Sequence, residues 1–232
     1  MSDLHLLRIP VNPPHLLRFA SQYGITQEDE TLGYVLHAWL MALFGKLAPK
    51  PFRYIDRRRE VLAYASSDAK TLLDHAQTFA SPQAWVALDP GGMASKPMPT
   101  AWKVGQHLRL EVITCPVSRQ GEDEKDLYLR ALDHLGEAAP SRAAVYQKWF
   151  VEQWTDTARI DRVELLGLRA RTRLLRRARN ATNHLRIVER PQALFGADAV
   201  IIDVERFAQR LSRGVGRHRA FGFGMVLLAP PR

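Results

Sequence analysis

Residues 204–232 read VERFAQRLSRGVGRHRAFGFGMVLLAPPR, and this stretch decides the fold. Apolar residues recur at helical spacing in its first part, which predicts a short amphipathic helix over residues 204–213. Glycines alternating with basic residues follow, and the apolar run at 225–228 predicts a closing strand. The tail is therefore predicted as a helix, a glycine-rich loop over residues 213–224 and a C-terminal strand.

The glycine-rich loop has the composition of an anion-binding segment. Its glycines allow positive φ and let another stretch of backbone approach closely. Successive exposed N–H groups in such a loop form an anion-binding concavity, and the arginines beside them favour phosphate. The alternative is a tight helix-to-strand turn with solvated arginines. The residues concerned are Arg213, Gly214, Gly216, Arg217, His218, Arg219, Gly222 and Gly224.

Length and charge narrow the class of protein. A chain of 232 residues suits one large domain or two small ones. The net charge of +9 favours a polyanionic partner, and no basic amphipathic anchor helix supports the alternative of a membrane surface. No signal-peptide pattern opens the chain, and the single cysteine, Cys115, cannot form an internal disulfide. We therefore expect a cytoplasmic protein with a nucleic acid partner, with Cys115 as a buried strand residue.

The first half of the sequence predicts the order β, α, β, β, α, β, which is that of a ferredoxin-like domain. Residues 82–99 read as irregular, with one short strand at 85–88. We therefore predict an N-terminal ferredoxin-like domain over residues 1–118. Its strands are expected at 4–9, 52–55, 60–66 and 106–114, and its helices at 31–44 and 67–79, with a short helix or turn at 16–23.

The second half predicts a second domain of the same kind over residues 119–232. A polar linker at 117–124 precedes it, and a turn at Gly196 separates two of its strands. Its first strand lies in or before residues 125–154, where the pattern does not place it. The fold class is thus α+β, with two tandem ferredoxin-like domains, antiparallel sheets and a basic cleft between them. Helices are expected at 125–136 and 141–154, and strands at 163–175, 184–194 and 199–203.

Tyr34 and His37 are the candidate catalytic residues. They stand three residues apart on the first long helix, so both side chains lie on one face. Cleavage of RNA by its own 2′-hydroxyl needs proton transfers and nearby cations, and histidine titrates near neutral pH. This chemistry requires no metal or cofactor. The alternative is that His37 is a partly buried packing residue.

Residues 169–190, which we call the basic hairpin, form the third candidate element. They hold eight arginines and one acid, and alternation places Arg169, Arg171 and Arg173 on one strand face. Arginine grips phosphate with two parallel hydrogen bonds and can read guanine. A solvated edge that discourages sheet pairing is the alternative. The predicted RNA contacts are Arg171, Arg173, Arg176, Arg177 and Arg179.

The order of these elements resembles the RAMP superfamily of CRISPR-associated RNA-binding proteins, and most closely its CasE branch. Tyr-Val-Leu-His at 34–37 resembles the Tyr-x-x-His element of CasE enzymes, and the glycine-rich loop and basic hairpin follow in the same order. The resemblance implies that His37 is a catalytic acid/base and that Tyr34 positions or activates at the cleavage site. It also implies RNA contact by the glycine-rich loop.

The activity implied by the resemblance is maturation of CRISPR RNA in a type I-E or related type IV system. The enzyme would cut precursor RNA at the base of the repeat stem-loop without a metal, leaving a 2′,3′-cyclic phosphate and a 5′-hydroxyl. It would then stay on the product stem-loop and join other CRISPR proteins in an effector complex.

Some features leave alternatives open. Where the family often has basic residues after the histidine, this chain has Ala38 and Ala42, so Arg18, Arg217 or Arg219 would have to supply the phosphate charge. Cleavage that rests mostly on arginines is one alternative. A non-cleaving assembly subunit and an unrelated basic DNA-binding protein are two others. No metal site is predicted.

Overall fold

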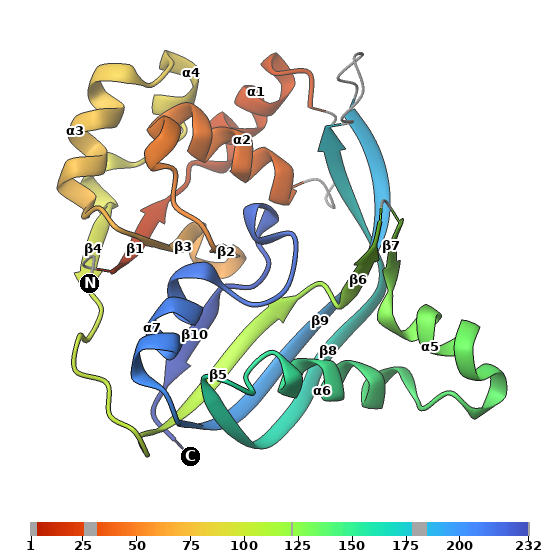
Figure 1. Cartoon of the computed structure of the whole chain (residues 1–232). Coiled ribbons are helices and arrows are strands. Elements are labelled where there is room, and N and C mark those ends of the chain that lie inside the picture. The colour runs from red at the N-terminus through yellow and green to blue at the C-terminus, as the bar shows by residue number, and fades with distance from the viewer. Residues whose placement is uncertain (1–3, 26–31, 122, 178–184, 232) are drawn as a thin grey trace.

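Two four-stranded antiparallel sheets form the framework of the computed structural model (Figure 1). The structure describes residues 4–25, 32–121, 123–177 and 185–231. Within these residues no helix is both long and apolar enough to cross a membrane.

The first sheet has the strand order β2-β3-β1-β4, with neighbouring strands antiparallel. Its helices cover one face, on which Leu7 and Ile9 are fully buried. Leu6 and Tyr64 reach the core of the second half from the other face. The elements are β1 (His5–Pro10), α1 (Pro13–Gln22), α2 (Leu32–Phe44), β2 (Phe52–Ile55), β3 (Glu60–Ala65), α3 (Ala69–Phe79), α4 (Pro82–Trp85) and β4 (Ala94–Pro97).

Helix α2 is held in the first core by its apolar face. Leu36, Leu40 and Leu43 are buried at helical spacing, as the sequence predicts. Trp39 is also buried, and its indole N–H donates to the carbonyl of Ala84 at 2.9 Å, which ties α2 to α4. Tyr34 and His37, the candidate catalytic residues on the same helix, are only partly buried.

The second sheet has the order β10-β5-β9-β8 and is also antiparallel. Phe150 and Phe207 from two covering helices pack with Phe195 of the sheet. In both sheets the sequential strands take the order fourth, first, third, second, so both halves have the ferredoxin-like arrangement. The elements are β5 (His107–Thr114), α5 (Leu127–Leu135), α6 (Arg142–Glu152), β8 (Ala158–Arg177), β9 (Leu185–Ile201), α7 (Val204–Arg213) and β10 (Val226–Ala229).

The prediction that the strand at 106–114 completes the first sheet is wrong. β5 pairs with β9 and β10 and is the first strand of the second sheet. The missing strand of the first sheet is β4, which pairs with β1 and is too short and polar to show alternation. The strand predicted at 85–88 is also wrong: α4 occupies Trp85, and Leu88 makes only an isolated bridge to Val11.

Strand β9 is continuous, so the predicted turn at Gly196 is wrong. Gly196 pairs with Glu111 on one side and with Glu164 on the other. A Cβ there would lie 2.5 Å from the guanidinium of Arg109, which explains the glycine without a turn. Arg109 itself binds Asp198 at 3.0 Å.

Strand β8 begins at Ala158, earlier than predicted, and contains three register shifts against β9. One shift lies between Arg169, which pairs with Gln192, and Thr172, which pairs with Arg190. The extra residue reverses the alternation, so Arg173 lies on the opposite face from Arg169. The prediction that Arg169, Arg171 and Arg173 share one face is therefore wrong.

The predicted linker at 117–124 forms a small hairpin of β6 (Val117–Gln120) and β7 (Asp123–Asp126). Asp126, at its end, caps α5 and accepts a hydrogen bond from the Tyr146 hydroxyl at 2.7 Å. Arg142 also pairs with Asp126. The two strands are short and mostly polar, VSRQ and DEKD, so they lack the apolar alternation by which a sequence indicates a strand.

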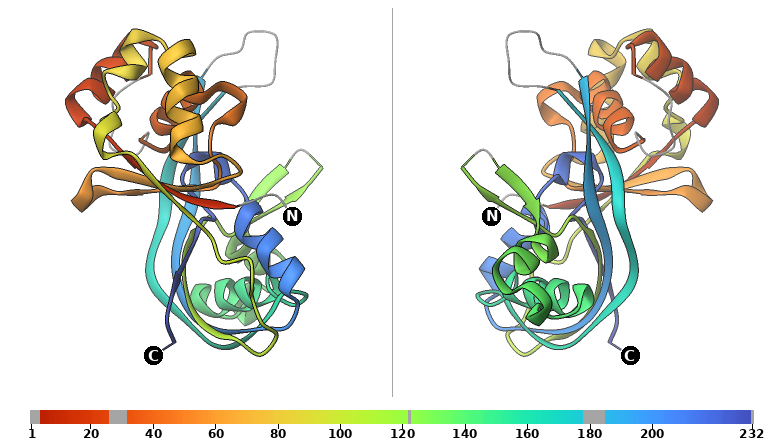
Figure 2. Two further views of the ribbon diagram at one scale, coloured as in Figure 1. Left: turned by 90° about the vertical axis from the view of Figure 1, so that its left-hand side faces the viewer. Right: turned by 90° about the vertical axis from the view of Figure 1, so that its right-hand side faces the viewer.

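The two halves are joined along β8 and β9, which run from the second sheet to the helices of the first half (Figure 2). Leu175, near the far end of β8, is buried in the same core as α2. Across the interface the Tyr64 hydroxyl donates to the carbonyl of Val226 at 2.8 Å. Arg53 and Glu111 form an ion pair at 2.7 Å. The basic hairpin is therefore attached to the helix that carries Tyr34 and His37.

Candidate functional site

An aromatic cluster brings the predicted catalytic helix and the glycine-rich loop together. Phe221, in the short 3-10 helix η6 (Arg219–Phe221), stacks on Tyr34 with ring centroids 6.0 Å apart. The edge-to-face contact between Phe221 and His37 has centroids 5.5 Å apart. The rings of Tyr34 and His37 lie 6.5 Å apart. Residues separated by almost the whole sequence thus meet at one site.

Gly33 makes this approach possible. A Cβ at position 33 would overlap with the carbonyl oxygen of Phe221, so a larger residue would push the loop away from α2. The glycine lies one residue before Tyr34, and the contact fixes the loop against the first turn of the helix.

The glycine-rich loop uses the backbone freedom that the sequence predicts. Gly214, Gly216, Gly222 and Gly224 all have positive φ. Val215 donates its N–H to the carbonyl of Gly224 at 2.9 Å, which closes the loop upon itself. The loop is therefore a defined structure rather than a loose connection.

A basic hollow of about 700 Å³ opens beside this loop. Phe221 and Lys50 form part of its wall, so it adjoins the aromatic cluster. Its lining does not include Arg18, which the sequence offers as a source of phosphate charge. The lining residues are Lys50, Pro51, Ser212, Arg213, Gly216, Arg217, His218, Arg219, Ala220 and Phe221.

Burial and charge keep His37 neutral. Burial lowers the pKa of His37 below its usual value, and the positive charge of Lys50 lowers it further. At neutral pH the imidazole is therefore mostly unprotonated and can accept a proton.

Glu124 of β7 anchors the glycine-rich loop from outside. Its carboxylate accepts from Arg217 Nε at 2.7 Å and from Arg190 Nε at 2.9 Å, and it contacts His218 Nε2 at 2.8 Å. The His218 side chain is only 3% exposed. Burial raises the pKa of Glu124, but hydrogen bonds from Arg190 and the charge of His218 outweigh it, and the pKa falls to about 2.

The basic hairpin presents Arg171 and Arg173 to solvent. Arg171 pairs loosely with Glu189 at 3.8 Å on the surface. Arg176 and Arg177 are the last two residues of β8 and pair with Arg186 and Leu185 of β9, so the strand extends beyond its predicted end at 175. Their side chains lie outside the described residues, as does all of Arg179. Leu174 packs with Phe223 of the glycine-rich loop, so hairpin and loop share a small core.

Comparisons with known proteins agree with this arrangement. The family model described as "CRISPR associated protein" matches residues 4–230. The chain belongs to this family of CRISPR-associated proteins. No curated protein matches its sequence.

Solved structures show the fold that this CRISPR-associated protein shares. Thermus thermophilus Cse3, bound to an RNA representing a pre-cleavage complex, is 19% identical with a TM-score of 0.62, over 98% of this chain and all of that one. Cas6e of Escherichia coli is 14% identical with a TM-score of 0.60, at 98% and 100% coverage. A chain of a CRISPR RNA-guided surveillance complex is 18% identical with a TM-score of 0.58, again at 98% and 100% coverage. These likenesses confirm the predicted fold.

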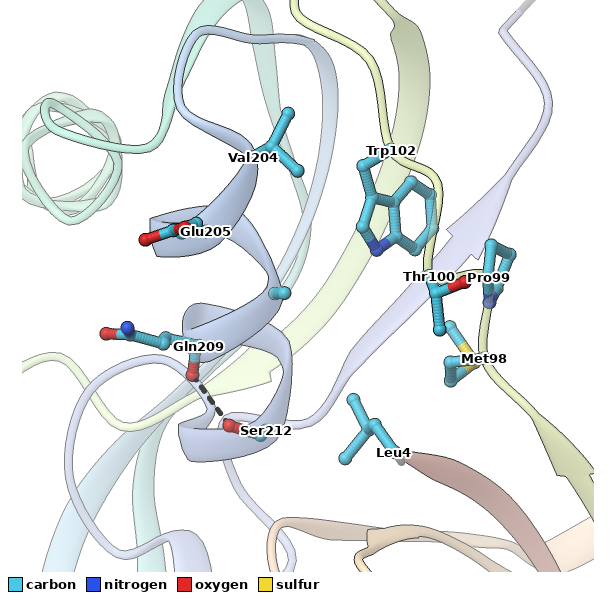
Figure 3. A pocket seen from close by; sticks show the side chains of 10 residues that line it. Leu4, Met98, Pro99, Thr100, Trp102, Val204, Glu205, Gln209 and Ser212 are labelled. Atoms are coloured by element: carbon cyan, nitrogen blue, oxygen red, sulfur yellow. Dashed lines mark hydrogen bonds between the residues drawn. The ribbon is translucent and has the colours of Figure 1, made fainter. Parts of the chain in front are cut away.

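A second cavity in this CRISPR-associated protein lies away from the aromatic cluster. It measures about 340 Å³ and lies between α7 and the segment from Met98 to Trp102. Figure 3 shows Val204 of α7 on the side of Trp102, whereas the side chains of Glu205 and Gln209 point away from Trp102. Unlike the basic hollow, which Phe221 lines, this cavity contains no residue of the aromatic cluster, and we assign it no part in the site.

Lys50, Glu124 and Phe221 are site residues that the sequence analysis does not predict. Lys50 follows α2 by several residues in a proline-flanked turn, where no periodic pattern marks it. Glu124 stands in a segment that reads as a linker. Glu124 is also an acid, so a search for basic residues that could bind an anion does not select it. Phe221 lies far from Tyr34 and His37 in sequence, and only the fold brings them together.

Proposed function

We propose that this protein is a CRISPR RNA maturation endoribonuclease that binds a repeat stem-loop and cleaves the precursor RNA. The observation that carries the proposal is the meeting of Tyr34 and His37 with Phe221 beside a basic hollow. The shared fold supports it, since one relative is named CRISPR endoribonuclease Cse3 and is bound to a 19-nucleotide RNA.

The reaction is attack by a 2′-hydroxyl on the adjacent phosphate. His37, neutral at pH 7, takes the proton from O2′ as O2′ bonds to phosphorus. The bond from phosphorus to O5′ breaks, its electron pair leaves on O5′, and O5′ takes a proton from solvent. The products are a 2′,3′-cyclic phosphate and a 5′-hydroxyl, and no step uses a metal. Tyr34, stacked on Phe221, positions the nucleotide at the cleavage site.

Lys50, Arg217 and Arg219 supply the positive charge near the phosphate. All three line the basic hollow, and Lys50 acts on His37 electrostatically. Fixed cations stabilise the extra negative charge of the transition state in a partly desolvated site. They replace the basic residues that are absent at Ala38 and Ala42.

The RNA stem-loop lies against the basic hairpin and the glycine-rich loop. Arginine-rich hairpins and loops suit an A-form stem, which is recognised by shape and phosphate contacts. After cleavage the protein stays on the product stem-loop and joins other CRISPR effector proteins; the surveillance-complex relative supports this. The proposed contacts are Arg171, Arg173, Arg176, Arg177, Arg179, Arg213, Gly216, Arg217, Arg219 and Gly222. Gly214, His218 and Gly224, which the sequence also predicts as contacts, shape the loop instead: the two glycines are buried with their N–H groups bonded to the carbonyls of Arg210 and Ile113, and the buried His218 side chain contacts Glu124.

Incubation with repeat RNA in excess chelator tests the function. We expect cleavage at one position at the base of the stem, and we expect the upstream product to end in a 2′,3′-cyclic phosphate that acid converts to a monophosphate. Tight binding without cleavage would indicate the assembly-subunit alternative. Equal competition by duplex DNA at fixed salt would indicate the DNA-binding alternative, since only RNA has the A-form shape and 2′-hydroxyls.

Replacing Arg176 and Arg177 with alanine should weaken RNA binding and reduce its salt dependence. If each residue neutralises one phosphate, the plot of log affinity against log salt should flatten by about 0.7–0.9 per lost contact, because fewer counterions are released. Filter binding at several salt concentrations measures the slope. Cleavage at saturating RNA should persist.

The matched control replaces Arg57 and Arg58, two adjacent exposed arginines in the turn between β2 and β3. It removes the same charge from a site outside the proposed RNA surface, so its slope should stay near that of the wild type. An unchanged slope in the Arg176 and Arg177 variant would show that these two arginines do not contact RNA and form only a solvated strand edge. Loss of cleavage at saturation would place them at the scissile phosphate instead.

A further inference from the structure

Glu124 is an acid buried within the basic surface of the protein. Its side chain is 6% exposed and lies among basic groups from two elements: Arg190 of β9, and Arg217 and His218 of the glycine-rich loop. An exposed carboxylate at this position would repel a polyanion. Buried beneath the loop, it contacts the protein's own cations instead, so its role is to organise the loop.

His218 shows why the loop needs an anchor. It has φ +60, in the left-handed region that non-glycine residues rarely adopt. Such a conformation persists where surrounding contacts impose it, and the contact with Glu124 is one of them. The carbonyl of His218 accepts the N–H of Phe221 at 2.8 Å. A short chain of contacts therefore runs from Glu124 through His218 to the ring that touches Tyr34 and His37.

Arg190 extends the same anchor to the basic hairpin. It lies on β9 at the base of the hairpin and shares the Glu124 carboxylate with the loop. The carboxylate thus joins the strand that leads to the stem-binding arginines and the loop that carries Phe221.

We propose that Glu124 is a positioning residue for RNA cleavage. It holds the glycine-rich loop in a fixed position relative to α2 and to the basic hairpin. The proposal rests on the proposed function and identifies what aligns its site. Glu124 touches neither RNA nor the reacting atoms. It acts through Arg217 and His218 on one side and through Arg190 on the other.

The Glu124 carboxylate is ionised at any pH near neutrality. Its pKa is lowered to about 2, since Arg190, His218 and Arg217 outweigh the burial that would raise it. The neighbouring Cys115 thiol is buried, and its pKa is raised, so it adds no charge near neutrality. Glu124→Gln therefore removes a charge that is always present, whereas Glu124→Asp keeps it on a shorter side chain.

The test measures cleavage and binding separately in the full-length protein. Under single-turnover conditions with saturating repeat RNA, Glu124→Gln should cleave about 10²-fold more slowly, the scale expected when a reacting group is misplaced by about 1 Å. Its Kd for the RNA should stay within a few-fold of the wild type. Glu124→Asp should recover part of the rate. Glu137→Gln, at an exposed acid in the same half, makes the same change in net charge and should cleave normally.

Trp149 gives a readout of the loop that is independent of activity. A Cβ on Gly216 would lie 3.1 Å from the Trp149 ring, so the two are in direct contact. In protein labelled with fluorotryptophan, the ¹⁹F resonance of Trp149 is identified as the one that disappears in Trp149→Phe. This resonance should shift in Glu124→Gln and stay unchanged in Glu137→Gln. A thermal melt of each variant separates loop displacement from unfolding.

The possible outcomes are distinct. Normal cleavage by Glu124→Gln with an unshifted Trp149 resonance would overturn the proposal. Weaker RNA binding with a normal rate at saturation would also overturn it and make Glu124 part of the binding surface. If the wild-type protein itself fails to cleave, the proposed function falls, and a shifted or unshifted resonance still decides whether Glu124 holds the loop.

Discussion

Replacing His37 with alanine should slow cleavage of bound repeat RNA by about 10²–10⁴-fold, the usual contribution of one acid–base group. RNA affinity should change little, because His37 acts on a proton and carries no charge at neutral pH. Single-turnover rates and Kd values measure the two effects. His134→Ala, at an exposed histidine on α5, is the matched control and should cleave normally.

The dependence of the cleavage rate on pH should reflect the titration of His37. Because burial and Lys50 lower the pKa of His37, the neutral base persists at moderately acidic pH. The cleavage rate should therefore stay level from neutral pH downward and fall only below the usual histidine pKa of about 6.5. Wild-type rates in His37→Ala across the whole range would reject the assignment and leave cleavage by arginines.

A repeat RNA with a single 2′-deoxy nucleotide at the cleavage site should bind normally and remain uncut. The attacking hydroxyl is missing, and no group in the proposed mechanism replaces it. Gel analysis after long incubation measures residual cleavage, and Kd confirms that binding survives.

The control substrate carries the 2′-deoxy substitution one nucleotide downstream, where the sugar is not the nucleophile. It should be cut at the normal rate. Cleavage of the first substrate would mean that water or a protein side chain attacks the phosphorus, and the mechanism would have to be replaced.

The parts of the site that local sequence specifies were predictable. The glycines of the tail need positive φ at their own positions, and the α2 pattern shows which side faces the core. Tyr34 and His37 lie on the remaining side because of helical spacing alone. These features depend on residues that are close together in the sequence, so the sequence pattern is enough to predict them.

The parts set by distant partners were not predictable. β5 carries the alternation of a half-buried strand in either sheet, and only its pairing with β9 and β10 decides between them. The bulge after Arg169 depends on how β8 fits against β9. Lys50 and Glu124 gain their roles from neighbours far along the chain.

The burial of Leu175 beside α2 has a consequence for protein synthesis. Domains fold largely from the N-terminus as the chain emerges from the ribosome. Here the core around α2 stays incomplete until residue 175 has emerged, and Phe221 meets Tyr34 and His37 later still. A nascent chain therefore carries its histidine long before it carries the loop that shapes the site. In the proposed mechanism, the cleavage site is therefore complete only after residue 221 has emerged and the loop has docked on α2.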